Sequence, residues 1–271
     1  MGRMLSNSRL LDKLLTGEYL PILNLVKNDP DLSIEMRIKN QPKVYYKKSL
    51  LLTLFPNRKP ELLAVGYWKE GIQPILDVNF PESYFDQAKK LVEKHIDVKK
   101  NIEFTIQQKI TTDNNSLRNQ FLVIDMEYQF AQEKVKNRTN GKTRFDLVAI
   151  DLKINKIMLL ELKQGLGSLS GNAGVDDHFL RYQEHVAHPI FQSALREDVK
   201  GIISSKNQLG LWDFNASSLV LQVDQAEIDY AYVFAAHSSA ELILYKQQYG
   251  EKYTTLYLEV QANNYILKDG I

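Results

Sequence analysis

Two carboxylates and one lysine, Asp146, Glu161 and Lys163, lie within a stretch rich in apolar residues between Thr143 and Gly165 (TRFDLVAIDLKINKIMLLELKQG). Carboxylates that lie close together repel one another, and a bound divalent cation relieves that repulsion. Oxygen ligands of this kind suit Mg²⁺, which proteins bind through one or two carboxylates together with water and substrate phosphate. A neighbouring lysine suits a phosphate group or a developing oxyanion. If the three side chains converge, the expected chemistry is metal-assisted reaction at a phosphate.

A β-hairpin is the element expected to bring them together. The stretch has two runs rich in Leu, Ile and Val, separated by the polar residues 153–156, and it is too short for two helices. Because side chains alternate along a strand, Glu161 and Lys163 share one face. A turn centred between Ile154 and Asn155 places Lys163 opposite Asp146, and a slightly shifted turn places Glu161 there instead.

The spacing of these residues resembles the D…(D/E)xK signature of the PD-(D/E)XK nuclease superfamily, with Phe145 in the place of the proline. The resemblance implies an α/β fold, with a restriction-endonuclease-like mixed central β-sheet flanked by helices. It also implies hydrolysis of phosphodiester bonds in nucleic acid, with DNA as the expected substrate. Asp146 and Glu161 would then bind Mg²⁺ or Mn²⁺, and Lys163 would position the attacking water or stabilise the transition state.

Two alternatives to an active nuclease stay open. The three residues could form a structural ion-pair cluster, since alternating charges are ordinary on a solvated strand face. The chain could also be a catalytically inactive binding or adaptor module that keeps the nuclease fold. A glycosidase with Asp146 and Glu161 as paired acids fits poorly, because the lysine has no role in that mechanism.

Two further glutamates are candidates for the site. In the superfamily, a helix before the central strands often contributes a glutamate, and Glu103 in the expected helix Val98–Ile110 is our catalytic candidate for that role. A surface glutamate is an equally good interpretation. Glu127 lies in the expected strand Phe121–Phe130 and is an accessory acid if that strand pairs beside Asp146. We favour slightly the alternative that its charge balances Arg144 or Lys142.

The helix expected after residue 177 supplies weaker candidates. A Gln or Tyr there often touches the site in the superfamily, so Tyr182 and Gln183 are accessory candidates. Three histidines, His178, His185 and His188, lie on the same segment. Their spacing does not match a zinc-binding helix motif, and we expect neutral surface histidines.

A loop from Ala131 to Lys142 (AQEKVKNRTNGK) holds the strongest local concentration of positive charge. Beside a phosphodiester-cleaving site it would hold the substrate backbone. Exposed loops are also commonly rich in lysine for solubility alone. The four cationic residues assigned to nucleic-acid binding are Lys134, Lys136, Arg138 and Lys142.

Composition sets the broad class. The chain has 271 residues, of which 44% are hydrophobic, and its net charge is +1, so any nucleic-acid site must be a local patch. It has no cysteine, which excludes disulfides and Cys-ligated zinc. No apolar run reaches membrane-spanning length, and a cytoplasmic location without membrane partners is expected. The sequence is compatible with a homodimer.

No repeat, low-complexity tract or long linker marks a domain boundary, and we expect two domains that divide near Pro74–Pro81. Residues 1–80 form a small N-terminal α+β unit, and residues 81–271 form the nuclease-like domain. Helices are expected over 10–26 (split by Pro21), 83–96, 98–110, 178–200 (interrupted near Pro189) and 241–249. Strands are expected over 43–55, 62–68, 121–130, the two arms of the hairpin, 219–223, 230–236, 255–260 and 265–267.

Overall fold

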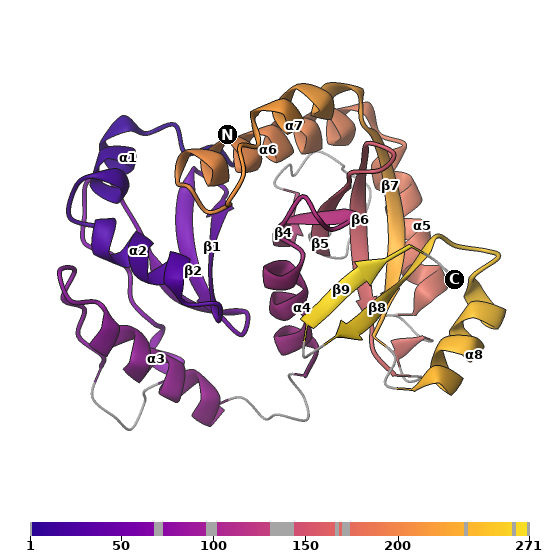
Figure 1. Ribbon diagram of the computed structural model, residues 1–271, viewed down its shortest axis with the longest axis horizontal. Coiled ribbons are helices and arrows are strands. Elements are labelled where there is room, and N and C mark those ends of the chain that lie inside the picture. Colours follow the sequence, from indigo (N-terminus) through magenta and orange to yellow (C-terminus); the bar gives the residue numbers. More distant parts are fainter. Residues whose placement is uncertain are drawn as a thin grey trace. The chain divides into compact units, whose positions relative to one another are not determined.

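The computed structural model describes residues 2–67, 73–95, 102–130, 144–165, 168–169, 174–235, 238–261 and 264–269 (Figure 1). Contacts divide the chain into two compact units, each made of two separate segments. Unit 1 comprises Met1–Gln108 and Lys200–Ser217, and unit 2 comprises Lys109–Val199 and Ser218–Ile271. Residues 81–108, expected to belong to the second domain, thus lie in unit 1. Whether the independently folding domains divide near residue 80 stays a prediction.

Unit 1 contains an antiparallel three-stranded sheet of order β1-β2-β3. The predicted single strand over residues 43–55 is instead a hairpin of β2 and β3. Lys47 and Lys48 adopt positive φ angles, 44° and 62°, and form its turn. The strand predicted over 62–68 is also wrong where it is described, since Val65–Tyr67 is a 3-10 turn. The elements are α1 (Ser8–Leu15), α2 (Leu20–Asn28), β1 (Leu32–Arg37), β2 (Gln41–Tyr46), β3 (Ser49–Thr53), η1 (Val65–Tyr67) and α3 (Glu82–His95).

Unit 2 is built on a six-stranded mixed sheet of order β4-β5-β6-β7-β8-β9. β4, β5 and β6 form an antiparallel meander; β7 is parallel to β6, β8 is parallel to β7, and β9 closes the sheet as an antiparallel edge. A mixed sheet flanked by helices is therefore confirmed. The strands are β4 (Phe121–Gln129), β5 (Arg144–Asp151), β6 (Lys156–Lys163), β7 (Glu227–Phe234), β8 (Thr255–Gln261) and β9 (Asn264–Lys268).

Helices α5 and α6 form the crossover that the parallel pair β6 and β7 requires. Pro189 begins α6, where its missing N–H costs no hydrogen bond. The predicted strand over 219–223 is wrong, because Leu219 and Val223 are buried one helical turn apart while Leu221 is 78% exposed. The helical elements that follow α3 along the chain are α4 (Ile102–Asp113), α5 (Val175–Val186), α6 (Pro189–Gln208), α7 (Ser217–Gln222), η4 (Val223–Gln225) and α8 (Ser239–Tyr249).

The core of unit 2 explains why its strands are apolar on both faces. Every residue of β5 after Arg144 and every residue of β6 after Lys156 is buried. These two strands have a paired strand on each side, and both of their alternating faces are buried, as in a strand covered on both faces of a sheet. Within the described part of the chain, no helix combines the length and the hydropathy needed to cross a bilayer.

Candidate functional site

The hairpin predicted from the sequence is present, and its register decides which charged residues meet. β5 and β6 pair from Leu147 with Leu160 to Asp151 with Lys156. Continuing this register by one residue places Asp146 opposite Glu161, so the shifted turn is the observed one. Glu161 and Lys163 lie two residues apart on β6 and share its face with Asp146 across the strand pair.

Direct contacts link Lys163 to Glu161, and Asp146 to the main chain of β6. The backbone N–H of Leu162 donates to Oδ2 of Asp146 over 2.9 Å. Nζ of Lys163 donates to Oε1 of Glu161 over 3.3 Å. Nδ1 of His178, near the start of α5, lies 2.5 Å from the same Oε1. Glu161 is thus held from two sides, by its own strand and by the following helix.

This cluster is buried more deeply than charged groups usually are. Asp146 and Glu161 are each 7% exposed and Lys163 is 3% exposed. Two carboxylates in such a place are costly unless cations compensate them. Lys163 supplies one positive charge, and a protonated His178 would supply a second. The arrangement therefore suits either a bound cation or a compensated ion-pair cluster.

Tyrosines on β7 form one wall of the site. Tyr232 pairs in register with Glu161, and Nζ of Lys163 lies 6.0 Å from the centre of the Tyr232 ring. Burial raises the pKa of Tyr230 well above its usual value, and the charges of Glu161 and Asp146 raise it further. Tyr230 consequently keeps its proton at neutral pH and can act only as a neutral hydroxyl beside the carboxylates.

The accessory residues predicted on α5 fall in different surroundings. Tyr182 is buried and stacks on Tyr230 with 4.3 Å between the ring centroids. It therefore packs against a tyrosine of the site, and no contact between Tyr182 and the carboxylates is found among the described residues. Gln183, the next residue, is exposed on α5.

Glu127 makes the structural contact that we favoured from the sequence. Its Oε2 lies 2.8 Å from Nη1 of Arg144, at the start of β5. Glu127 also has a positive φ of 55°, which marks a local irregularity of β4 opposite Asp146. Its charge is therefore balanced by Arg144.

Several candidates lie outside the described residues. The backbone of Glu103 belongs to α4, and its side chain is not described. Lys134, Lys136, Arg138 and Lys142 all fall in residues 131–143, which are likewise outside the described ranges. Their assignments to catalysis and to nucleic-acid binding stay predictions.

The histidines differ from expectation. His185, expected at the surface, is 9% exposed, and its ring packs edge-on against Phe145 and Phe191. His178, also expected at the surface, is the helix residue that contacts Glu161. The sequence held one usable signal: the first turn of a helix that follows a strand lies close to that strand's end.

Among the described residues, the carboxylates of Asp146 and Glu161 are ligands of the type that a magnesium ion takes. Two carboxylates on neighbouring strands are the number that Mg²⁺ commonly takes from a protein, with water and phosphate completing its shell. Oδ2 of Asp146 accepts from the Leu162 amide, and Oε1 of Glu161 lies beside His178. Among the described residues there is no group of three or more His, Cys, Asp or Glu side chains placed to hold a metal. Asp146 and Glu161 would thus be the protein ligands.

Comparisons of the whole chain with models of protein families, with curated proteins and with solved structures gave no match.

Proposed function

We propose that this protein is a Mg²⁺-dependent nuclease that hydrolyses phosphodiester bonds of nucleic acid, with DNA as the expected substrate. The observation that carries the proposal is the convergence of Asp146, Glu161 and Lys163 at one end of two central strands of unit 2. A bound Mg²⁺ would supply charge for the transferring phosphate and a more acidic water. This chemistry explains two carboxylates and a lysine together.

The order of elements supports the same proposal. A helix (α4) precedes the strand with Asp146; the hairpin leads to the strand with Glu161 and Lys163, and α5 follows. This is the order implied by the resemblance to PD-(D/E)XK nucleases. The mixed sheet with flanking helices agrees with the fold that the resemblance implies, and a restriction-endonuclease-like fold is part of the proposal.

Each residue has a distinct part in the proposed reaction. Asp146 and Glu161 bind the metal, and Asp146 is fixed in place by the Leu162 amide. Lys163 brings an ammonium group to the phosphate oxygen on which negative charge grows, or positions the attacking water. His178 is a positioning residue, because its contact is with Glu161 and restricts the orientation of that carboxylate.

The first test is cleavage by two isosteric or near-isosteric variants. Glu161→Gln removes the charge needed for metal binding, and Lys163→Met removes the ammonium group while keeping the apolar stem. We expect each to lower Mg²⁺-dependent cleavage of labelled DNA by about 100-fold or more, the scale of losing one preorganised electrostatic group. The measurement is initial cleavage rate on single- and double-stranded DNA and RNA, with and without EDTA.

Matched controls carry the same change of charge at exposed positions. Glu227→Gln at the start of β7 and Lys153→Met in the hairpin turn should leave the rate within about 2-fold. Retained Mg²⁺-dependent cleavage by Glu161→Gln would overturn the assignment of the site.

The alternative is a binding module in which the three residues form only a structural ion-pair cluster, and one observation favours it. Lys163 and His178 already contact Oε1 of Glu161, as a compensated ion-pair cluster would require. Calorimetric titration of the wild-type chain with Mn²⁺ separates the two functions. If the chain is a nuclease, it binds Mn²⁺, and Glu161→Gln weakens that binding. If it is a binding module, it does not bind Mn²⁺ and does not cleave nucleic acid.

A further inference from the structure

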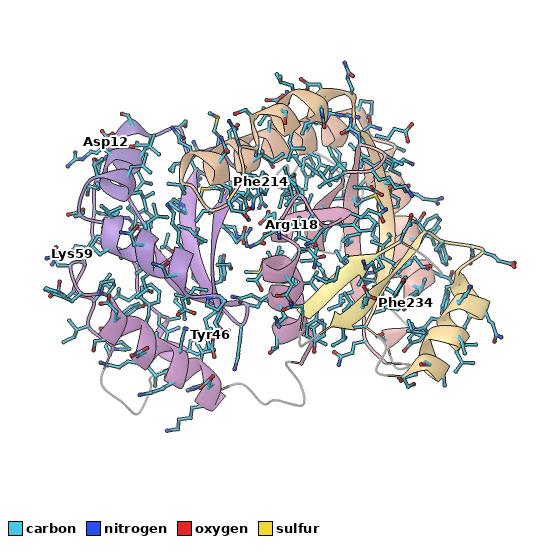
Figure 2. All side chains as sticks on the ribbon, viewed as in Figure 1. Asp12, Tyr46, Lys59, Arg118, Phe214 and Phe234 are labelled. Atoms are coloured by element: carbon cyan, nitrogen blue, oxygen red, sulfur yellow. The ribbon has the colours of Figure 1, made fainter. Side chains whose placement is uncertain are left out.

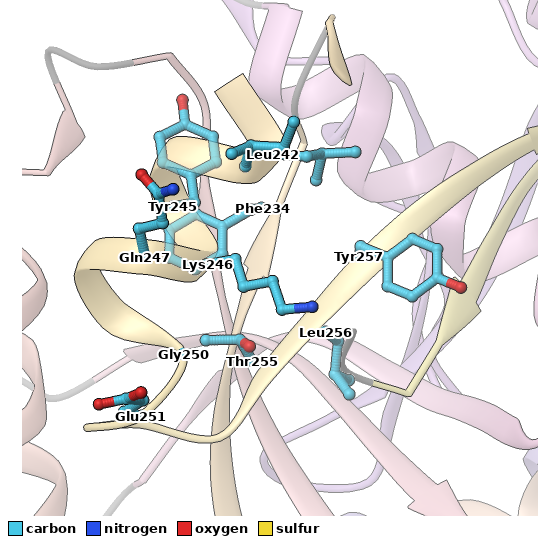
Figure 3. A pocket seen from close by; sticks show the side chains of 11 residues that line it. Phe234, Leu242, Tyr245, Lys246, Gln247, Gly250, Glu251, Thr255, Leu256 and Tyr257 are labelled. Carbon is cyan, nitrogen blue, oxygen red and sulfur yellow. The ribbon is translucent and has the colours of Figure 1, made fainter. Parts of the chain in front are cut away.

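Unit 2 contains a pocket that shares no residue with the proposed nuclease site. This pocket of about 530 Å³ opens between α8 and the beginning of β8, and Figure 3 shows the side chains that line it. Its volume is within the range of small-ligand sites. Phe234, at the end of β7, forms part of its wall and is labelled in Figures 2 and 3.

Aromatic rings dominate one part of the lining. Phe234 and Tyr245 stack with 4.6 Å between centroids and 19° between planes, and Tyr257 lines the pocket from β8. Tyr245 is 1% exposed, and its hydroxyl has no hydrogen-bond partner among the described residues. An aromatic lining of this kind suits a flat, unsaturated ring.

A cation stands at the mouth of the same pocket. Lys246 is exposed on α8, and Figure 3 shows its side chain extending toward the side where Tyr257 lies. Within the described ranges it has no ion-pair partner. Glu251 also lines the pocket, but its carboxylate is directed away from Lys246 in Figure 3. The pocket therefore offers a positive charge next to its aromatic wall.

The register of the sheet ties the pocket to the candidate site. Lys163 on β6 pairs with Phe234 on β7, and Phe234 pairs with Tyr257 on β8. Paired residues share a face of the sheet, and the backbone N–H of Ala235 donates to the carbonyl of Lys163 over 3.0 Å. Tyr257 is thus two strand spacings, roughly 10 Å, from Lys163. Three stacked nucleotides, at roughly 3.4 Å each, would span this distance.

We propose that this pocket binds one unpaired nucleotide of the strand being cut, with the base against Tyr257 and a phosphate at Lys246, while the buried Phe234 supports the pocket from behind. The proposal rests on the proposed nuclease function and names its substrate class: single-stranded nucleic acid, or the frayed end of a duplex. Stacking of bases on aromatic side chains, together with cations at phosphates, is the usual way in which proteins hold single strands. A fully paired duplex cannot insert a base and should bind less tightly.

Binding without cleavage tests this proposal separately from catalysis. The full chain is titrated, in EDTA, into a fluorescein-labelled single-stranded hexanucleotide, as DNA and as RNA, and into the blunt duplex of the same sequence; anisotropy gives Kd. We expect the single strand to bind at least about 5-fold tighter than the duplex. Tyr257→Ala should weaken single-strand binding by about 5-fold or more, the loss of one stacked base, and Tyr257→Phe should restore it.

The role of Lys246 is tested against a control variant that carries the same reversal of charge far from the pocket. Lys246→Glu should weaken binding by about 10-fold and lower the slope of log Kd against log salt by about 0.7, the value for one phosphate of a single strand. Lys153→Glu, in the exposed β5–β6 turn at the opposite end of β6, should change neither. Equal weakening by both variants, or unchanged binding by Lys246→Glu, overturns the proposal.

Failure of this inference and failure of the nuclease function give different results. If the wild type cleaves but Tyr257→Ala and Lys246→Glu bind normally, the pocket proposal is wrong and the enzyme stands. If single strands bind through the pocket but no Mg²⁺-dependent cleavage occurs, the pocket stands and the chain is a binding module.

Discussion

Asp146 has a structural contact as well as a proposed chemical one. Its Oδ2 accepts the hydrogen bond of the Leu162 amide, so the carboxylate satisfies a buried main-chain donor of the neighbouring strand. Alanine at this position would remove the charge and the acceptor together. Loss of activity in that variant would not separate metal binding from local unfolding of β6.

We expect Asp146→Asn and Asp146→Ala to differ in stability while both lose cleavage. Asparagine keeps a carbonyl oxygen that can accept from Leu162, whereas alanine leaves a buried N–H without its acceptor. The cost of that unmet group is about 1–3 kcal/mol. Urea unfolding should therefore place Asp146→Ala about 1–3 kcal/mol below Asp146→Asn. Equal stabilities would contradict the structural role of the hydrogen bond.

At the residue scale, the sequence revealed the three site residues but not their neighbours. Asp146, Glu161 and Lys163 stand out because charge is rare in runs buried on both faces. His178 carries a weaker signal: the first turn of a helix lies close to the end of the preceding strand, but spacing alone does not fix the direction in which that helix returns across the sheet. Tyr230 and Tyr232 look like ordinary strand residues until the parallel pairing with β6 places them beside Glu161.

At the scale of elements, one buried tyrosine holds α3 to its surroundings in unit 1. The hydroxyl of Tyr84 donates to the carbonyl of Leu51 in β3 over 2.5 Å and accepts from the N–H of Leu63 over 2.9 Å. The side chain is fully buried, and burial raises the pKa of Tyr84 from 10.0 to about 12. One side chain thus joins a helix, a strand and a loop.

This raised pKa predicts loss of stability in alkali. Between pH 10 and about 12 the unfolded chain loses the Tyr84 proton and the folded chain keeps it, so the contribution is complete below pH 10 and is lost as pH rises toward 12. The slope is about 1.4 kcal/mol per pH unit. Tyr84→Phe should be less stable at pH 8 by about 1–3 kcal/mol but show a shallower decline above pH 10 in denaturant titrations. An unchanged slope would contradict the assignment.

Strongly periodic elements were predictable, and short apolar runs were not. The helices α3 and α8 and the strands β4 to β7 lie close to their predicted ranges, because long runs with one clear period leave little choice. The β2–β3 hairpin was missed because Lys47-Lys48 lacks the Asn-Gly or Asp-Gly signal of a tight turn. The run Leu219–Val223 is five residues long, too short for its period to distinguish a strand from a helix.

At the scale of the whole molecule, the two units are discontinuous in sequence. Residues 200–217 belong to unit 1, where Nζ of Lys206 lies 3.0 Å from Glu35 of β1 and the Leu5 amide donates to Ser205 over 2.7 Å. Gly201 packs so closely on Met4 that a Cβ there would lie 2.9 Å from the Met4 side chain. The pattern of α6 runs unbroken across residue 200, so the sequence gives no sign of this division.

These contacts predict how a fragment cut at the expected boundary behaves. Residues 81–271 alone would lack the N-terminal segment that packs against 200–217, leaving Ile202 and Ile203, buried in the full chain, open to solvent. We expect the fragment to bind the dye ANS and to be cleaved by trypsin within 200–217, where the full chain resists. A fragment that resists trypsin and melts at the temperature of the full chain would show instead that the folding boundary lies near residue 80.

Because unit 1 is made of two segments far apart in the sequence, its fold cannot be complete until the ribosome has made the second segment. The ribosome makes the first 108 residues, then the 91 residues from Lys109 to Val199, and only then the segment Lys200–Ser217. At roughly 5–20 residues per second, the 109 residues between Gln108 and Ser217 take about 5–20 s to appear. For that interval Glu35 has no Lys206, so residues 1–108 lack this ion pair until the segment 200–217 has been made.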